Sequence, residues 1–245
     1  MNRVAHLSTV ELKLLLRRKT TVVSVVLVPL GLAALTLFGT RPPDVAEWGG
    51  LLARNFLLLM TLSVYLVSLT VFTARRQSLV LKRLRTSELR DGEVLAGVLG
   101  PVVLVGLVQT LGYYAFCLAI GAPIPASPGL LALGIVLALA TATAIGVATA
   151  CLTRSVEATQ LTAMPPLIAA MAGMFLTASG AVAPTIVGLA MPLAGPTDLV
   201  AKGWGAPGAV VADVAVVPLD LASTVLWLAV AGVLFNRLFR WEPRA

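Results

Sequence analysis

Long apolar runs alternate with short polar segments along the whole chain. A transmembrane helix needs about 20 mainly apolar residues to cross the hydrocarbon core of a bilayer. Six runs reach this length, and we interpret each as a transmembrane helix. They are Thr20–Phe38, Leu51–Phe72, Val94–Ile120, Leu130–Thr153, Thr159–Ala178 and Pro218–Phe239. The pattern predicts an all-α integral membrane protein in which residues 1–245 form a single transmembrane domain.

The first 19 residues show the spacing of an amphipathic helix. Polar side chains recur every three or four positions on one face, and apolar side chains recur on another. The polar stripe contains His6, Thr9, Lys13 and Arg17, and the apolar stripe contains Leu7, Val10 and Leu14. We therefore predict that this segment is a helix lying flat in the membrane interface before the chain enters the bilayer.

The segment 74–92 separates the second and third apolar runs and contains "VLKRLRTSELR". Burying its six basic residues would cost on the order of 15–20 kcal/mol, at about 2.5–3.5 kcal/mol each, so the segment must leave the bilayer. Leu81 and Leu84 lie three positions apart, whereas the lysine and arginines between and beside them face other directions on a helix. The segment is thus predicted to form a short amphipathic helix outside the membrane.

The segment 179–217 is apolar, but glycine and proline interrupt it too often for a membrane-spanning helix. The interruptions are Gly180, Pro184, Gly188, Pro192, Gly195 and Pro196. Such a segment suits short helical pieces that enter one leaflet and return, where other parts of the protein cover the backbone. We predict a re-entrant hairpin between the fifth and sixth spans.

Composition and charge support a membrane location. Hydrophobic residues make up 58% of the chain and charged residues 12%, with a mean hydropathy of +0.96. Fifteen of the 18 lysines and arginines lie in the N-terminal segment, the second-to-third and fourth-to-fifth connections and the C-terminus. Arg41, Arg54 and Lys202 lie on the other side. By the positive-inside rule, both termini face the cytoplasm. The net charge of +7 therefore reflects topology, and we expect no nucleic-acid partner.

Residues for catalysis or metal binding are scarce. The sequence has no GxxxxGK[ST] phosphate-binding loop, so any ATP hydrolysis must belong to a partner. His6 is the single histidine, which argues against a zinc or haem site. The apolar runs carry no cluster of nucleophile, base and acid. We therefore expect no catalytic residue, no metal and no cofactor bound by this chain.

A few polar residues interrupt the apolar runs. Asp220 lies near the outer end of the sixth run, where reaching water or capping the helix is favoured over a proton-relay role. Gln109 could bind cargo or a neighbouring helix, and the neighbouring helix is favoured. Arg54 is expected to extend toward the lipid head groups.

The second-to-third connection carries the strongest family resemblance. The chain reads "RRQSLVLKRLRTSELRDGEVLAG" from Arg75 to Gly97, where ABC-2 type transporter permeases often read close to RRERGxLKRLRxTPL. In that family this segment is the coupling helix, which docks on a separate ATPase subunit. The resemblance implies a list of ATPase-coupling residues: Arg75, Arg76, Gln77, Leu81, Lys82, Arg83, Leu84 and Arg85.

Other segments resemble the same family, including its drug-resistance exporter branch. "ELKLLLRRKTTVVSVVLVPLGL" is similar to the entry into the first span, with Pro29 at the matching place. "FLTASGAVAP" resembles the end of the fifth span, and "MPLAGPTDLVAKGW" resembles the segment after the outer hairpin. Ser179 and Gly180 match there, and with Gln109 and Asp220 they are candidates for the cargo path or the seam between subunits.

Three positions depart from the family pattern. Gln77 stands where glutamate is usual, Leu79 where glycine is common, and Glu88 where proline usually follows threonine. One hypothesis is a specialised half of a heterodimer. The other is ordinary sequence drift at a tolerant contact surface, which we slightly favour.

The resemblance implies the membrane subunit of a bacterial plasma-membrane exporter. Two permease subunits, identical or different, would pair above two ATPase subunits that hold ATP and magnesium. The 14 aromatic residues offer few stacking platforms for sugars, which slightly favours a hydrophobic drug, lipid or peptide as cargo. Two alternatives stay open: a transporter driven by an ion gradient, and a structural or assembly membrane protein.

Overall fold

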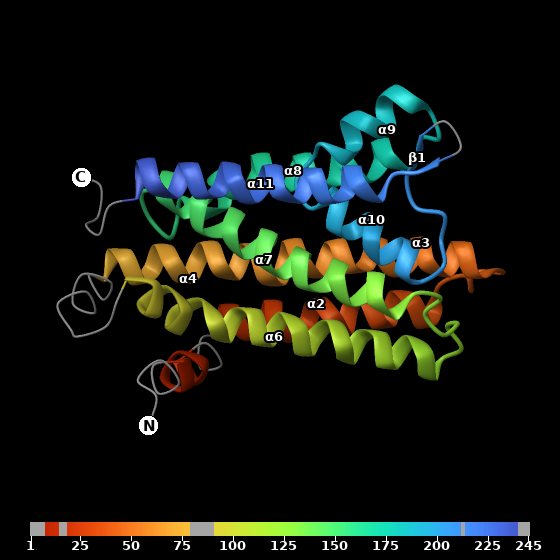
Figure 1. Ribbon diagram of the computed structural model, residues 1–245. Helices are drawn as coiled ribbons and strands as arrows, with labels where there is room; N and C mark the ends of the chain where they lie inside the picture. Colours follow the sequence, from red (N-terminus) through yellow and green to blue (C-terminus); the bar gives the residue numbers. More distant parts are fainter. Residues whose placement is uncertain (1–7, 15–18, 79–90, 212–213, 240–245) are drawn as a thin grey trace.

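The computed structural model describes residues 8–14, 19–78, 91–211 and 214–239, and shows a bundle of long, roughly aligned helices (Figure 1). Residues 8–14 form a short helix. The long elements, in chain order, are α2 (Lys19–Phe38), α3 (Val45–Leu59), the π-helix η1 (Met60–Tyr65), α4 (Leu66–Gln77), α6 (Asp91–Ala119), α7 (Pro128–Leu152), α8 (Thr159–Thr177) and α11 (Val217–Leu238). Between α8 and α11 lie α9 (Val182–Leu189), α10 (Ala194–Gly203), β1 (Val210–Val211) and β2 (Val214–Ala215).

In the part of the chain that the structure describes, five helical segments are long and apolar enough to cross a membrane. They are Val45–Gln77, Gly92–Ala119, Pro128–Leu152, Thr159–Thr177 and Val217–Leu238. The predicted second to sixth runs thus lie in helices long and apolar enough to cross a membrane, while their crossing of a membrane stays a prediction. Helix α2 has 20 residues, of which Val25–Phe38 form an apolar helix shorter than these five, so the first span stays a prediction.

The second span is longer than its apolar run and changes helix type in the middle. At its start, the Asp44 carboxylate accepts a hydrogen bond of 2.8 Å from the Glu47 amide, so the helix begins six residues before the predicted Leu51. Within η1, the Leu66 amide donates to the Thr61 carbonyl five positions back, the pattern of a π-helix. Such π-helical turns occur often at functional positions.

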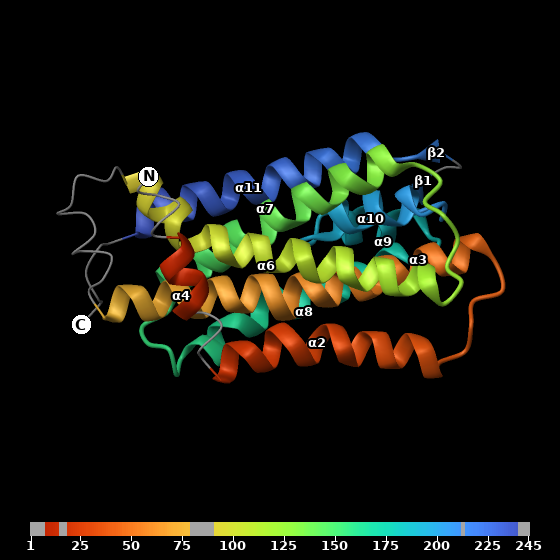
Figure 2. The ribbon, with the colours of Figure 1, turned by 90° about the horizontal axis from the view of Figure 1, so that it is seen from below.

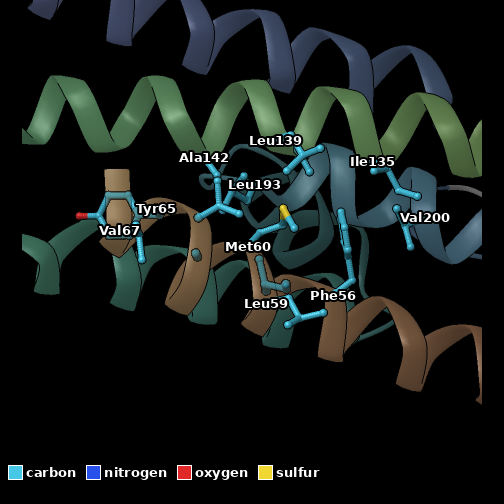
Figure 3. Packing of buried hydrophobic residues seen from close by; sticks show 14 of the residues in the cluster. Phe56, Leu59, Met60, Tyr65, Val67, Ile135, Leu139, Ala142, Leu193 and Val200 are labelled. Atoms are coloured by element: carbon cyan, nitrogen blue, oxygen red, sulfur yellow. The ribbon is translucent and has the colours of Figure 1, made fainter. Parts of the chain in front are cut away.

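Among the described spans, α7 is second in burial to Val45–Gln77, and it packs against α10, α11, α4 and η1. Figure 3 shows Ile135, Leu139 and Ala142 of α7 facing side chains of the second span and α10. At Gly146 an added Cβ atom would lie 2.8 Å from the Tyr65 carbonyl oxygen. A larger residue would push the two helices apart, and small residues allow this kind of close packing between membrane helices.

The segment 179–217 contains the short helical pieces that its composition predicts. Helix α10 packs against α7, α11 and α3, and it is buried over most of its length. An added Cβ atom at Gly195 would lie 2.2 Å from the Asp220 carbonyl oxygen, so α10 and α11 touch at the backbone. The antiparallel pairing of β1 with β2 was not predicted from the sequence. Entry of this segment into a leaflet stays a prediction.

The connections divide between two ends of the bundle (Figures 1 and 2). The end of α4, the start of α6, the α7–α8 connection and the end of α11 lie together, beside the helix of residues 8–14. We call this the basic end, because Arg75, Arg76, Arg154 and Arg237 belong to it. The start of α3, helix α9 and the β1–β2 pair lie at the opposite end. The described parts of the predicted cytoplasmic segments thus share one end, while their cytoplasmic location stays a prediction.

Candidate functional site

The last turn of α4 carries the first three predicted coupling residues, each of which contacts a different part of the chain. Arg75 Nε donates a hydrogen bond of 3.1 Å to Glu11 Oε2. Both side chains are largely buried, and the contact is also an ion pair. It fixes the helix of residues 8–14 to the end of the second span.

Arg76 lies deeper in the bundle, with a relative exposure of 2%. Its Nη2 atom donates a hydrogen bond to the carbonyl oxygen of Thr153, the residue that ends α7. Carbonyl groups in the last turn of a helix have no partner within that helix, so they need one from elsewhere. The Arg76 guanidinium supplies this partner and joins α4 to α7.

Gln77 extends the same set of contacts into the α7–α8 connection. Its Oε1 atom accepts a hydrogen bond of 3.2 Å from the Val156 amide. Beside it, the hydroxyl oxygens of Thr153 and Thr162 lie 2.8 Å apart, which links the end of α7 to α8. We call Glu11, Arg75, Arg76, Gln77 and Thr153 the brace.

The brace lies directly before the part of the predicted coupling helix that carries most of its charge. Leu81, Lys82, Arg83, Leu84 and Arg85 lie outside the described residues, so their contact with an ATPase stays a prediction. Sequence reasoning identified Arg75, Arg76 and Gln77 but missed Glu11 and Thr153. Glu11 carried a usable signal, because it is the single acidic residue before Asp44 and so an evident partner for nearby arginines.

Gln109 makes the helix–helix contact that the sequence favoured. Its Nε2 atom donates to the Val25 carbonyl oxygen of α2 at 2.5 Å and lies 3.4 Å from the Ser63 hydroxyl in η1. Its role in a cargo path stays a prediction.

A second polar contact between spans was not foreseen. Asn55 Nδ2 donates to the Tyr113 hydroxyl at 2.6 Å, and the Thr36 hydroxyl lies 2.9 Å from the same oxygen. These three residues join α3, α6 and α2 in the bundle interior, where each polar group needs a partner. The three residues lie far apart in the sequence, so their spacing does not predict this contact.

Ser179 and Gly180 form the exposed turn between α8 and α9. The Ser179 hydroxyl donates to the Leu176 carbonyl oxygen at 2.7 Å, and Gly180 has a φ angle of +71°. A positive φ favours glycine over residues with a Cβ atom. The two residues thus form the turn that separates α8 from α9, and a part in the cargo path stays a prediction.

Asp220 does not reach water or cap its helix, because its side chain is fully buried and forms no helix-capping hydrogen bond. The Lys202 Nζ atom lies 2.6 Å from Asp220 Oδ2 and 2.6 Å from Asp198 Oδ2. Asp198 Oδ1 in turn accepts a hydrogen bond of 2.6 Å from the Ala209 amide. The sequence interpretation missed the cationic partner, which permits burial of the carboxylate.

We call Asp198, Lys202 and Asp220 the Lys202 cluster. It ties α10 to the first turn of α11 and to the strand region that follows α10. The sequence treated Lys202 as a marker of topology and gave no sign of this contact. Within the described residues, no group of three histidine, cysteine, aspartate or glutamate side chains could hold a metal ion.

The chain matches a known protein family. The model of a family described as "ABC-2 family transporter protein" matches residues 21–238, which is most of the chain. No curated protein and no solved structure gives a significant match.

Proposed function

Because the chain belongs to the ABC-2 transporter family, we propose that it is the membrane-spanning permease subunit of an ATP-binding-cassette exporter. ATP hydrolysis then belongs to a separate subunit, which would hold ATP and magnesium. Two copies of that ATPase would serve a pair of permease subunits, identical or different. The observation that carries this proposal is the brace, which joins the segment before the coupling helix to three other parts of the bundle.

The proposed mechanism is mechanical transmission through the end of α4. ATP-driven closure of the ATPase pair pushes on the basic segment, in which Lys82, Arg83 and Arg85 pair with acidic residues of the ATPase. Leu81 and Leu84 fill a groove on its surface. The sequence also predicted that Arg76 pairs with the ATPase, but Arg76 is buried and, like Arg75, is engaged inside this chain, so both act one step later. The push therefore reaches helix 8–14, α7 and the α7–α8 connection together.

The π-helix η1 is a point in the second span where force from the ATPase could change the conformation of the helix. It lies between α3 and α4, at the level where Ser63 meets Gln109. Its backbone hydrogen bonds already differ from those of an α-helix, so conversion to an α-helix would rotate α4 relative to α3. In this proposal η1 is the joint between the brace and the opposite end of the bundle.

The topology completes the proposal. Six spans, with α2 as the first, cross the bacterial plasma membrane, and both termini face the cytoplasm with the basic end. Helix 8–14 then lies at the cytoplasmic interface, which agrees with the exposure of Val10 and Leu14. Segment 179–217 lies at the outer side. Cargo passes between two subunits, and a hydrophobic or amphipathic drug, lipid or peptide suits the apolar helices.

A transporter driven by an ion gradient is the main alternative. Such proteins use acidic residues within spans to carry or coordinate the ion. Among the acidic residues in the described spans, Asp220 is the buried one, and it is engaged with Lys202. This pairing favours a structural role for the carboxylate. A structural or assembly protein would need neither ion nor ATPase, so recovery of an ATPase separates it from the exporter.

Reversing two charges of the coupling segment provides the test. Arg83→Glu with Arg85→Glu should abolish recovery of an ATPase subunit when the tagged chain is purified in mild detergent from its native membrane. The reason is that two attractive contacts with acidic residues become repulsive. Co-purifying chains are identified by mass spectrometry, and ATP hydrolysis is measured on the eluate.

Arg41→Glu serves as the matched control, since Arg41 is exposed at the opposite end of the bundle. It should leave ATPase recovery unchanged. Full export and full ATPase recovery by the double variant would overturn the proposed role of the segment. A wild-type preparation without any ATPase, beside an intact control exporter, would favour the ion-driven or structural alternative.

A further inference from the structure

A cavity of about 380 Å³ lies at the opposite end of the bundle, between α3, the end of α8, α10 and residues 206–209. Cavities that bind small ligands start at about 300 Å³ and combine apolar walls with a few polar groups. Small side chains form most of its walls, and Leu57 and Met174 supply larger apolar surfaces. Its charged lining residues are Glu47, Arg54 and Asp198.

Helix α3 presents two opposite charges to this cavity at different depths. Glu47 lies in its first turn, and Arg54 lies seven residues farther along. Seven residues correspond to about two turns, or about 10 Å along the axis. Side chains on a helix lean toward its N-terminus, so a side chain as long as that of Arg54 can reach part of the distance toward Glu47. Both residues are exposed, which makes their charged groups accessible to a ligand.

The Asp198 carboxylate already has partners within the chain. Its two carboxylate oxygens contact Lys202 and the Ala209 amide. Glu47 and Arg54 therefore supply the charges that a ligand would meet, with the acid nearer the end of the bundle and the guanidinium nearer its middle.

We propose that this cavity binds a zwitterionic phospholipid with an ammonium head group, such as phosphatidylethanolamine. In this lipid the ammonium group lies outermost, the phosphate follows, and the acyl chains extend toward the middle of the bilayer. Along α3, Glu47, Arg54 and Leu57 follow the same order from the end of the bundle inward, and Met174 of α8 adds apolar surface to the cavity. An arginine can hold a phosphate through two parallel hydrogen bonds, which favours Arg54 as the anchor.

This inference goes beyond the exporter proposal. It requires that the bundle lies in a bilayer, and it holds with or without an ATPase subunit. Its test therefore uses lipid binding alone, so failure of the lipid site and failure of the exporter function give different results.

The experiment measures retention of added lipid by the full-length protein in detergent, using native mass spectrometry. Phosphatidylethanolamine should bind several times more tightly than phosphatidylglycerol, which has the phosphate but no ammonium. Arg54→Glu should weaken phosphatidylethanolamine binding about tenfold or more, as expected for loss of a charge-assisted hydrogen bond. Arg54→Lys should weaken binding too, but less than Arg54→Glu, because lysine keeps the charge and loses the second parallel hydrogen bond. Glu47→Lys should remove the preference over phosphatidylglycerol.

Arg41→Glu is the matched control, because Arg41 is exposed near the start of α3 but does not line the cavity. Unchanged binding by this variant, with loss in Arg54→Glu, would support the site. The site would be overturned if the wild type retained the two lipids equally and Arg54→Glu retained as much of each lipid as the wild type. Glycerophosphoethanolamine, the head group without acyl chains, should bind far more weakly; equal binding would also overturn the assignment to a lipid. Unfolding midpoints measured without lipid identify any variant that fails to fold. If Arg54→Glu fails to fold, the test uses Arg54→Lys, and phosphatidylethanolamine binding equal to that of the wild type would then overturn the site.

Discussion

Replacing Lys202 by methionine is expected to lower the free energy of unfolding by about 3–5 kcal/mol, the cost of removing one partner from a buried ion pair. Methionine retains most of the volume of lysine and removes its charge. The carboxylates of Asp198 and Asp220 would then face each other in the bundle interior without the ammonium group that lies 2.6 Å from each. The contact of α10 with α11 would weaken first, because the cluster joins these helices.

The measurement is thermal or denaturant unfolding of the purified chain in one fixed detergent. Lys13→Met is the matched control, since Lys13 is exposed on helix 8–14 and should contribute little to stability. The triple variant Lys202→Met with Asp198→Asn and Asp220→Asn should recover much of the loss, because it removes the uncompensated charges. A loss below about 1 kcal/mol for Lys202→Met would contradict a stabilising role for the cluster.

The apolar runs predicted the long helices well because length and hydropathy are local properties. The second span shows the limit of that signal. Its helix continues from Val45 to Gln77, because Asp44 caps the start and Arg75 and Arg76 find partners at the end. Hydropathy depends on apolar side chains alone. A span predicted from hydropathy therefore ends at the first polar residues, even where the helix continues.

The contacts between distant positions could not be predicted in the same way. Lys202 and Asp220 lie 18 residues apart, and their pairing depends on the close approach of α10 to α11 at Gly195. Thr36, Asn55 and Tyr113 likewise meet because three spans are neighbours. From one sequence, each of these residues is an isolated polar residue near or within an apolar stretch.

The brace contains residues that a local sequence motif identifies and partners that only the fold brings to them. The motif at Arg75–Gln77 marks the position in the chain, and family resemblance supplies a function for the segment that follows. The partners Glu11, Thr153 and Val156 come from three separate regions, and only the fold brings them to the end of α4. The resulting distinction between residues that bind the ATPase and residues that transmit its movement can be tested.

Arg76→Ala is expected to reduce export and cargo-stimulated ATP hydrolysis about tenfold or more, while the ATPase subunit still co-purifies. Arg76 is buried, and its guanidinium holds the Thr153 carbonyl oxygen at the end of α7. A hydrogen bond to a charged group contributes about 1.5–3 kcal/mol, and each 1.4 kcal/mol corresponds to about tenfold. Without this contact, movement of the coupling segment would reach α4 but pass less effectively to α7.

The assay compares cargo export from vesicles with ATP hydrolysis and ATPase recovery on the same preparation. Arg237→Ala is the matched control, because Arg237 lies exposed at the basic end in the last turn of α11 and should leave all three quantities unchanged. Loss of ATPase recovery in Arg76→Ala would place Arg76 in the docking surface and contradict transmission. Normal export would contradict any role for the brace in coupling. Arg76→Ala is expected to keep ATPase recovery and lose export, whereas the Arg83 and Arg85 reversal is expected to lose ATPase recovery itself. This difference separates transmission of movement from docking.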